Sequence, residues 1–140
     1  MKKEVTLTIT GLHENEGENH NLESKLPANY IYKDGKHLVL AKEEVEGSVI
    51  NLRLTFDTKT LEVRRSGEVV TELVFENDRV HETMYRTPFG AIPVRTETRE
   101  YYLNEKDIEK GLLEGALKYK LFVDGNANSD ATLVFRVETT

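Results

Sequence analysis

Apolar and polar residues alternate along most of this chain. Residues 5–10, 50–57 and 117–123 all show this period of two. In the clearest case four apolar residues alternate with four polar ones: Ile50, Leu52, Leu54 and Phe56 against Asn51, Arg53, Thr55 and Asp57. Successive side chains of a β-strand point to opposite faces, so this period indicates a sheet with one buried face. Because nearly every segment carries it, the pattern predicts an all-β protein whose sheet curls to cover its own apolar face.

Short turn sequences separate these segments. Asp34-Gly35 is the clearest, because a glycine after an aspartate readily adopts the positive φ angles of a type I′ hairpin turn. Connections this short join antiparallel neighbours, since a parallel crossover needs about a dozen residues or more. The pattern predicts strands near residues 3–12, 24–33, 36–44, 48–57, 60–66, 68–76, 79–87, 91–103, 112–124 and 130–139.

Two segments interrupt the alternation. His13–Asn21 is polar and acidic, and we expect it to form a mobile loop. Asn104–Glu114 begins with a residue type that caps helices, so we expect at most one short helical turn there.

A long antiparallel meander can close as an up-and-down barrel or pack as a two-sheet sandwich. The succession of short hairpin connections favours the barrel, because sandwiches usually contain longer Greek-key connections. We therefore predict a single domain over residues 1–140, an antiparallel up-and-down β-barrel of eight to ten strands. The interior of a barrel of about eight strands is just wide enough for side chains or one small ligand.

Composition argues against several classes of function. The chain has no cysteine, which excludes thiol chemistry and cysteine-ligated metals. Its net charge of −6 opposes nucleic-acid binding, which depends on cationic neutralisation of phosphates. The first residues enter a strand pattern without the apolar stretch of a signal peptide, and no run is long enough to span a bilayer. We expect a cytoplasmic monomer or homodimer with no nucleic-acid or membrane partner.

We find no catalytic, metal or cofactor motif. Asp124–Asp130 resembles the opening of a calcium loop, but Phe135 stands where the bidentate glutamate is required. His13 and His20 are too far apart for a zinc motif, and His37 and His81 lie in strands without a visible partner. No serine has a nucleophile-elbow context. We expect no metal, no cofactor and no enzymatic activity.

The middle of the chain carries more specific motifs. They are Arg65-Ser66-Gly67, Phe75, Tyr85-Arg86-Thr87-Pro88-Phe89-Gly90 and the strand Ile92-Pro93-Val94-Arg95-Thr96-Glu97-Thr98-Arg99. Together they resemble the YwiB-like family of small bacterial domains of unknown function, over most of the chain. The resemblance implies a calycin-type, lipocalin-like β-barrel and, by analogy with lipocalins, a capacity to bind a ligand. Pro93 is unusual in a barrel strand, because it cannot donate a ladder hydrogen bond.

Binding chemistry could lie inside such a barrel. If Leu61 and Val63 face inward, Arg65 shares their face, and Thr96, Thr98 and Glu100 form a second inward row. Tyrosine can line a pocket mouth, although it also packs in cores. The candidate ligand-binding residues are Arg65, Tyr85, Thr96, Thr98 and Glu100.

These residues leave three interpretations open. They could orient a ligand in a mostly apolar cavity, or form an internal Arg–Glu pair that plugs one end of the barrel. A bulge near Pro93 could instead turn them to solvent. The leading hypothesis is a binding module for a small, partly apolar anionic ligand held by Arg65. The alternative is a protein-interaction or structural module with a filled barrel and no ligand.

Overall fold

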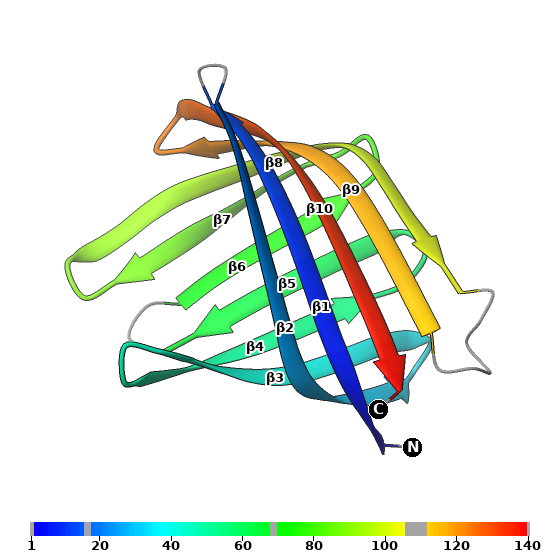
Figure 1. Ribbon diagram of the computed structural model, residues 1–140. Helices are drawn as coiled ribbons and strands as arrows, with labels where there is room; N and C mark the ends of the chain where they lie inside the picture. Colours follow the sequence, from blue (N-terminus) through cyan, green and yellow to red (C-terminus); the bar gives the residue numbers. More distant parts are fainter. Residues whose placement is uncertain (1, 16–17, 68–69, 106–111, 140) are drawn as a thin grey trace.

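Ten antiparallel strands close into a barrel in the computed structural model, which describes residues 2–15, 18–67, 70–105 and 112–139 (Figure 1). The strands are β1 (Lys2–Asn15), β2 (Glu18–Lys33), β3 (Lys36–Val45), β4 (Ser48–Phe56), β5 (Thr60–Ser66), β6 (Val70–Glu76), β7 (Val80–Thr87), β8 (Gly90–Asn104), β9 (Leu112–Val123) and β10 (Asn126–Thr139). Each strand pairs with its neighbours in sequence, and β1 pairs with β10 to close the barrel. The predicted antiparallel up-and-down barrel is confirmed.

The predicted strands all appear, but β1 and β2 are longer than expected. The expected loop at His13–Asn21 was wrong, because β1 continues to Asn15 and β2 begins at Glu18. Backbone pairing extends through His13↔His20 in this hairpin. Backbone hydrogen bonds can hold a hairpin together without alternating apolar residues. The polar sequence of this hairpin therefore did not predict its strands.

The helical turn expected between Asn104 and Glu114 falls mostly on residues 106–111, outside the described residues. Asn104 itself ends β8, and Leu112 begins β9. The described part of the chain contains no helix that is long and apolar enough to cross a membrane.

Tight turns set the register of the hairpins. Asp34 and Gly35 have φ angles of 54° and 78°, as a type I′ turn requires, which confirms the predicted hairpin. Asp124 and Gly125 have φ angles of 51° and 80°. The strands expected near 112–124 and 130–139 are therefore joined by a two-residue turn, and β10 begins directly after it, at Asn126.

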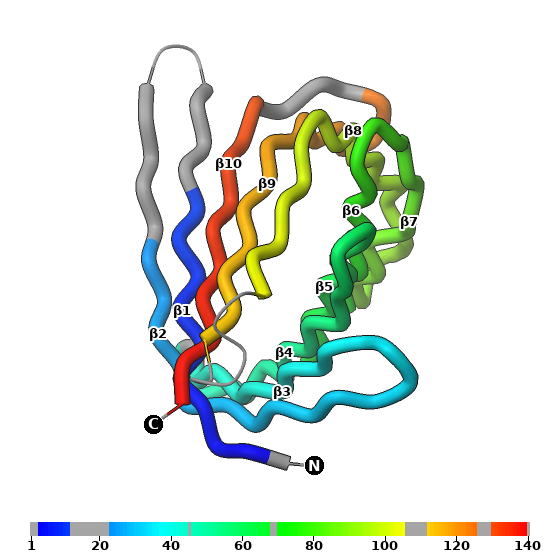
Figure 2. The backbone as a smooth tube through the Cα atoms, turned by 90° about the vertical axis from the view of Figure 1, so that its right-hand side faces the viewer, coloured from blue at the N-terminus to red at the C-terminus, as the bar shows by residue number. Residues whose placement is uncertain are grey.

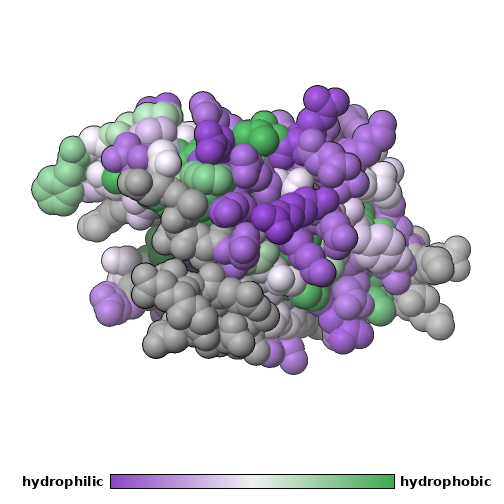
Figure 3. All heavy atoms as spheres, turned by 90° about the horizontal axis from the view of Figure 1, so that it is seen from above, coloured by the Kyte–Doolittle hydropathy of each residue, from purple (hydrophilic) through white to green (hydrophobic). Residues whose placement is uncertain are grey.

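Large apolar side chains fill the barrel. Phe56, Phe75 and Phe135 are fully buried, and the Phe56 and Phe135 rings meet with centroids 4.9 Å apart. In β4, Leu52 and Leu54 are also buried while Arg53 is exposed, as the alternation predicted; Ile50, near the start of the strand, is half-buried. Hydrophilic residues predominate among those coloured on the face in Figure 3. The apolar face of the sheet is therefore the barrel interior.

Two seams of the barrel are incompletely paired. β2 pairs with β3 only over Ala28–Lys33, although β2 begins at Glu18. β6 and β7 share one registered pair, Val70↔Arg86. At this second seam side-chain hydroxyls of β7 and β8 donate to backbone carbonyls of β6.

Candidate binding site

Thr96 and Thr98 lie inside the barrel, as the alternation predicted. Both are buried, and the Thr96 hydroxyl donates to the Val74 carbonyl at 2.6 Å. The Thr98 hydroxyl is buried without a hydrogen-bond partner among the described residues. Thr96 thus helps to hold β8 against β6, across the seam where the backbone ladder is sparse.

The inward position predicted for Glu100 was wrong. Thr98 pairs with Tyr119 and Glu100 pairs with Lys118, so Arg99 is an extra residue in β8. A bulge of one residue reverses the alternation. Glu100 therefore faces solvent, with its carboxylate 4.0 Å from Lys118 Nζ. The bulge lies at Arg99, six positions after the expected place at Pro93.

Tyr101 takes the inward position that Glu100 was expected to hold. Its ring is buried, and its hydroxyl donates to the Asp57 carbonyl at 2.7 Å. Burial raises the pKa of Tyr101, and the negative charges of Asp57 and Glu105 add to the effect. The phenol therefore remains a neutral hydrogen-bond donor that ties β8 to the turn after β4.

Arg65 continues the inward row of Leu61 and Val63, but it lies near the end of β5 and its side chain is 49% exposed. Its Nη2 donates to Glu43 Oε2 at 3.1 Å. An Arg–Glu pair therefore exists on the inward row, with Glu43 in place of the predicted Glu100. Tyr85 is half-buried on β7. Arg65, Thr96 and Glu100 contact β3, β6 and β9 respectively, so the candidates do not form one cluster.

The prediction that His37 lacks a partner was wrong. His37 is 1% exposed, its Nδ1 lies 2.6 Å from the Tyr30 hydroxyl, and its Nε2 lies 2.8 Å from Glu105 Oε2. A carboxylate oxygen accepts, so Nε2 carries the hydrogen that points to Glu105, and Nδ1 is the ring atom that meets the Tyr30 hydroxyl. Burial, then the charges of Tyr32 and Glu105, raise the pKa of Tyr30 and keep its hydroxyl protonated.

This Tyr30–His37–Glu105 chain joins the β2–β3 hairpin to the end of β8. The His37 ring also stacks on Phe56, with centroids 5.1 Å apart. Both ring nitrogens therefore have partners within the protein. His81 was likewise predicted without a partner, and its Nε2 lies 3.0 Å from Glu76 Oε1.

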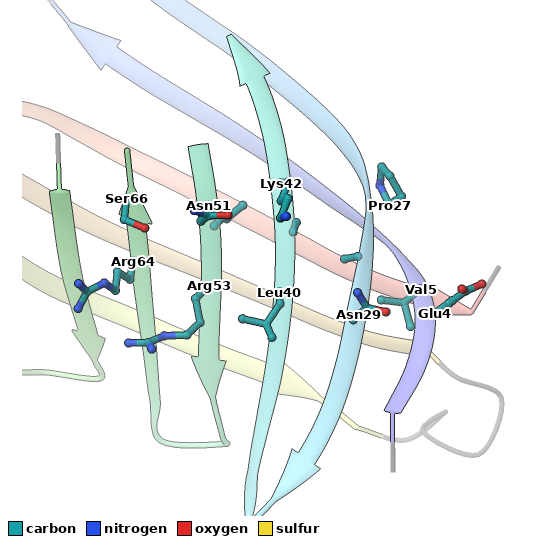
Figure 4. A pocket seen from close by; sticks show the side chains of 13 residues that line it. Glu4, Val5, Pro27, Asn29, Leu40, Lys42, Asn51, Arg53, Arg64 and Ser66 are labelled. Carbon is teal, nitrogen blue, oxygen red and sulfur yellow. The ribbon is translucent and has the colours of Figure 1, made fainter. Parts of the chain in front are cut away.

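A groove of about 780 Å³ lies on the outer face of the sheet, across β1 to β5 (Figure 4). The side chains that give it its chemistry are Leu40, Lys42, Asn51, Arg53, Arg64 and Ser66. They occupy the outward positions of β3, β4 and β5, whereas the residues between them, such as Ala41 and Leu52, are buried. Glu4 on β1 lies at the far end of the groove, which is otherwise rich in cations.

The basic end of the groove contains an unusual charge arrangement. Arg53 and Arg64 are directly paired across β4 and β5, and Figure 4 shows both side chains extending to the same side. Arg64 forms an ion pair with Glu72 on β6. Within the described part of the chain, no carboxylate lies within ion-pair distance of Arg53 or Lys42. Leu40, 37% exposed, places an apolar surface beside these cations.

Sequence reasoning missed this groove. The alternation did place Arg53 on the outer face. The tight turn after Phe56 sets Phe56 opposite Leu61, and in this register Arg53 lies opposite Arg64. The arginine pair was thus accessible from the sequence. The hollow was not, because it depends on how strongly the sheet coils.

The fold and the groove define a small β-barrel domain with a filled core and a basic outer groove. The chain belongs to a family described as a domain of unknown function (DUF1934), whose model matches residues 7–134. The structure is similar to the crystal structure of the ywiB protein from Bacillus subtilis, with a TM-score of 0.87 and 17% sequence identity, covering 99% of this chain and 93% of that chain. At this identity the likeness shows the fold alone. The predicted resemblance to the YwiB-like family is confirmed. No curated protein matches the chain.

Proposed function

We propose that this protein is a non-catalytic binding module for a small, partly apolar anionic ligand, which it holds in the outer groove. The observation that carries the proposal is the direct pairing of Arg53 with Arg64 in a groove beside exposed Leu40. Like charges directly opposite each other destabilise a sheet. An anion bound between the two guanidinium groups would turn this repulsion into attraction.

The residues of the groove fit such a ligand. A guanidinium presents a planar fork of donors that matches carboxylate and phosphate oxygens, and Lys42 supplies a further positive charge. Leu40 and Pro27 offer apolar contacts for the rest of the molecule. The groove volume of about 780 Å³ is within the ordinary range for small-molecule sites.

The barrel interior suits a ligand less well. Phe56, Phe75 and Phe135 occupy it together with a shell of leucines and valines, and interiors packed in this way leave little space for a guest. Arg65, the residue first expected to hold the anion, already has Glu43 as its partner. Arg64 is paired as well, with Glu72, but Arg53 directly opposite it has no carboxylate partner among the described residues. We therefore move the anion site from Arg65 to Arg53, with Arg64 beside it.

A second candidate function is a protein-interaction module with a filled barrel. It is favoured by Phe89, which is 99% exposed in the turn between β7 and β8. The Phe89 backbone N–H donates to the Thr87 hydroxyl at 3.1 Å, and that hydroxyl donates to the Gly90 carbonyl at 2.9 Å. A large apolar side chain in a braced turn can anchor a partner protein. Phe89→Ser would remove this anchor and leave ligand binding in the groove unchanged.

We further propose a cytoplasmic location without nucleic-acid or membrane partners. The absence of cysteine supports it, because secreted domains often depend on disulfides. The net charge of −6 opposes general attraction to phosphate backbones, even though the groove itself is basic. Fractionation of the host cell, followed by detection of the protein in each fraction, tests the location.

Isothermal titration with octanoate, octyl phosphate and uncharged octanol tests the function. We expect the two anions to bind and octanol to bind much more weakly. Arg53→Gln and Arg64→Gln should each weaken anion binding about tenfold or more, since a charge-assisted hydrogen bond contributes about 1.5–3 kcal/mol. Arg136→Gln, an exposed arginine on β10, is the matched control and should bind as the wild type does. Equal affinity in all four proteins, or no binding by wild type, would rule the proposal out.

A further inference from the structure

One edge of β2 lacks a strand partner over part of its length. β2 pairs with β1 from Glu18 to Ile31, but with β3 only from Ala28 onward. β3 leaves β2 at this point, and from Lys42 its remaining residues pair with β4 alone. In Figure 2 the described first part of β2 descends at the left of the view, and its last part turns along the bottom, where it lies beside β3. Among the described residues, no strand covers the edge before Ala28.

Such an edge offers backbone donors and acceptors to another strand. Unpaired N–H and C=O groups in a row are a template for pairing with another chain, and natural proteins usually block them. Lys25 and Pro27 on this edge are exposed and belong to the residue types that block edges. Such an edge pairs only with a strand whose side chains complement its charges.

The sequence of this edge is self-complementary. Residues 22–26 read Leu-Glu-Ser-Lys-Leu, which is symmetric about Ser24 except that Glu23 and Lys25 carry opposite charges. If two copies pair antiparallel with Ser24 opposite Ser24, Glu23 of each copy faces Lys25 of the other. Leu26, which packs against the core, then pairs with Leu22. A two-fold interface requires this reciprocity, in which residue i meets j and j meets i.

The same charges disfavour other registers. A shift that centres the pairing on residue 23 places Glu23 opposite Glu23, and a shift to residue 25 places Lys25 opposite Lys25. Like charges directly opposite each other are destabilising. An intermediate register, in which residue 23 of one copy lies opposite residue 24 of the other, places outward-facing residues of one copy opposite inward-facing residues of the other. The edge therefore favours one partner in one register.

We propose that this partner is a second copy of the chain, and that antiparallel β2–β2 pairing centred on Ser24 joins two barrels into one continuous sheet. Each interface then contains two Glu23–Lys25 pairs. This inference is independent of the outer groove, because it rests on the unpaired edge and on the charges of residues 23 and 25.

Charge reversal tests the proposal, with the mass measured by light scattering after size-exclusion chromatography and by sedimentation equilibrium. Wild type should have twice the mass of the chain. Glu23→Lys and Lys25→Glu should each weaken the dimer about tenfold or more, because each creates two like-charged pairs. An equimolar mixture of the two variants should form a heterodimer, since all its cross-strand pairs are complementary. The double variant should dimerise as wild type does.

The control is Glu62→Lys, an exposed position on β5, which is paired on both edges. This variant should remain a dimer. Circular dichroism melting should show that every variant is folded, because the substituted side chains are exposed. A wild type that is monomeric at high micromolar concentration would overturn the proposal. A dimer that neither reversal weakens, or variants that fail to complement each other, would overturn it as well.

Discussion

Arg53 and Arg64 are direct cross-strand partners on the outer face of β4 and β5. Glu72 offsets the charge of Arg64, but among the described residues no carboxylate offsets that of Arg53. Like charges directly opposite each other in a sheet are destabilising. This uncompensated charge is the basis of the proposed anion site.

Removal of one of these charges should therefore stabilise the ligand-free protein. We expect Arg53→Thr to raise the free energy of unfolding by about 0.2–1 kcal/mol, the usual range for cross-strand pairs. Urea denaturation monitored by circular dichroism measures the change. Arg136→Thr, which loses an ion pair with Glu138, should bring no gain. A loss of stability in Arg53→Thr would show that the arginine pair supports the fold.

The register of β4 can be tested by neighbouring substitutions. Leu54 is buried in the core, so Leu54→Ala should cost about 2–5 kcal/mol of unfolding free energy. Thr55 lies on the opposite face and is half-buried, so Thr55→Ala should cost less than about 1 kcal/mol. Chemical denaturation of both variants measures the difference. Similar losses from the two changes would contradict the register.

A close contact explains a glycine in the middle of β9. Gly115 pairs directly with Phe135, and a Cβ added to Gly115 would overlap the Phe135 ring. Phe135 is fully buried in the packed core, so the shift that relieves this overlap is costly, and Gly115→Ala should destabilise the protein by about 1–3 kcal/mol. Adding Phe135→Leu should make the alanine less costly than it is alone, as a thermodynamic double-mutant cycle would show. Additive effects would mean that the two residues do not meet.

Acid should weaken the turn after β4 through Asp57. Burial raises the pKa of Asp57, but the backbone N–H groups of Thr60 and Lys59 and the charge of Lys36 outweigh it, so its pKa lies below the ordinary 3.8. A carboxyl with a lowered pKa stabilises the fold above its unfolded pKa, and this contribution disappears as pH falls through the folded pKa.

The Asp57→Asn variant should therefore be less stable than wild type near neutral pH and approach it below a pH of about 4. The midpoint of urea unfolding, measured across this pH range, tests the prediction. Asp34→Asn, in an exposed turn, is the control and should follow the wild-type profile. A constant difference between Asp57→Asn and wild type at all pH values would contradict the role of ionised Asp57.

The fold was predictable because each strand carries its own signal. Alternation such as that of Leu52, Leu54 and Phe56 fixes the buried face, and two-residue turns such as Asp34-Gly35 fix the neighbours. These rules are local and need no knowledge of distant residues. They failed at Glu100, because the extra residue Arg99 reverses which side chains of β8 point inward, and no residue type in the sequence signals this bulge.

The sites were less predictable because they combine distant segments. The Asp34-Gly35 turn places His37 opposite Tyr32, so the sequence was sufficient to predict that His37 lies among the aromatic residues of the β2–β3 hairpin. Glu105 lies 68 positions away, and only barrel closure brings it to His37. The groove depends on the curvature of five strands, which alternation does not encode.

If the protein binds an anion on the outside of its barrel, as we propose, the backbone amides of the groove should respond to it. The most direct measurement is a ¹H–¹⁵N NMR titration of the labelled protein with octyl phosphate. We expect the shifted amides to cluster at residues 40–42, 51–53 and 64–66, and Arg53→Gln to suppress these shifts. Shifts centred on the interior residues Thr96 and Thr98, or no saturable shifts at all, would contradict it.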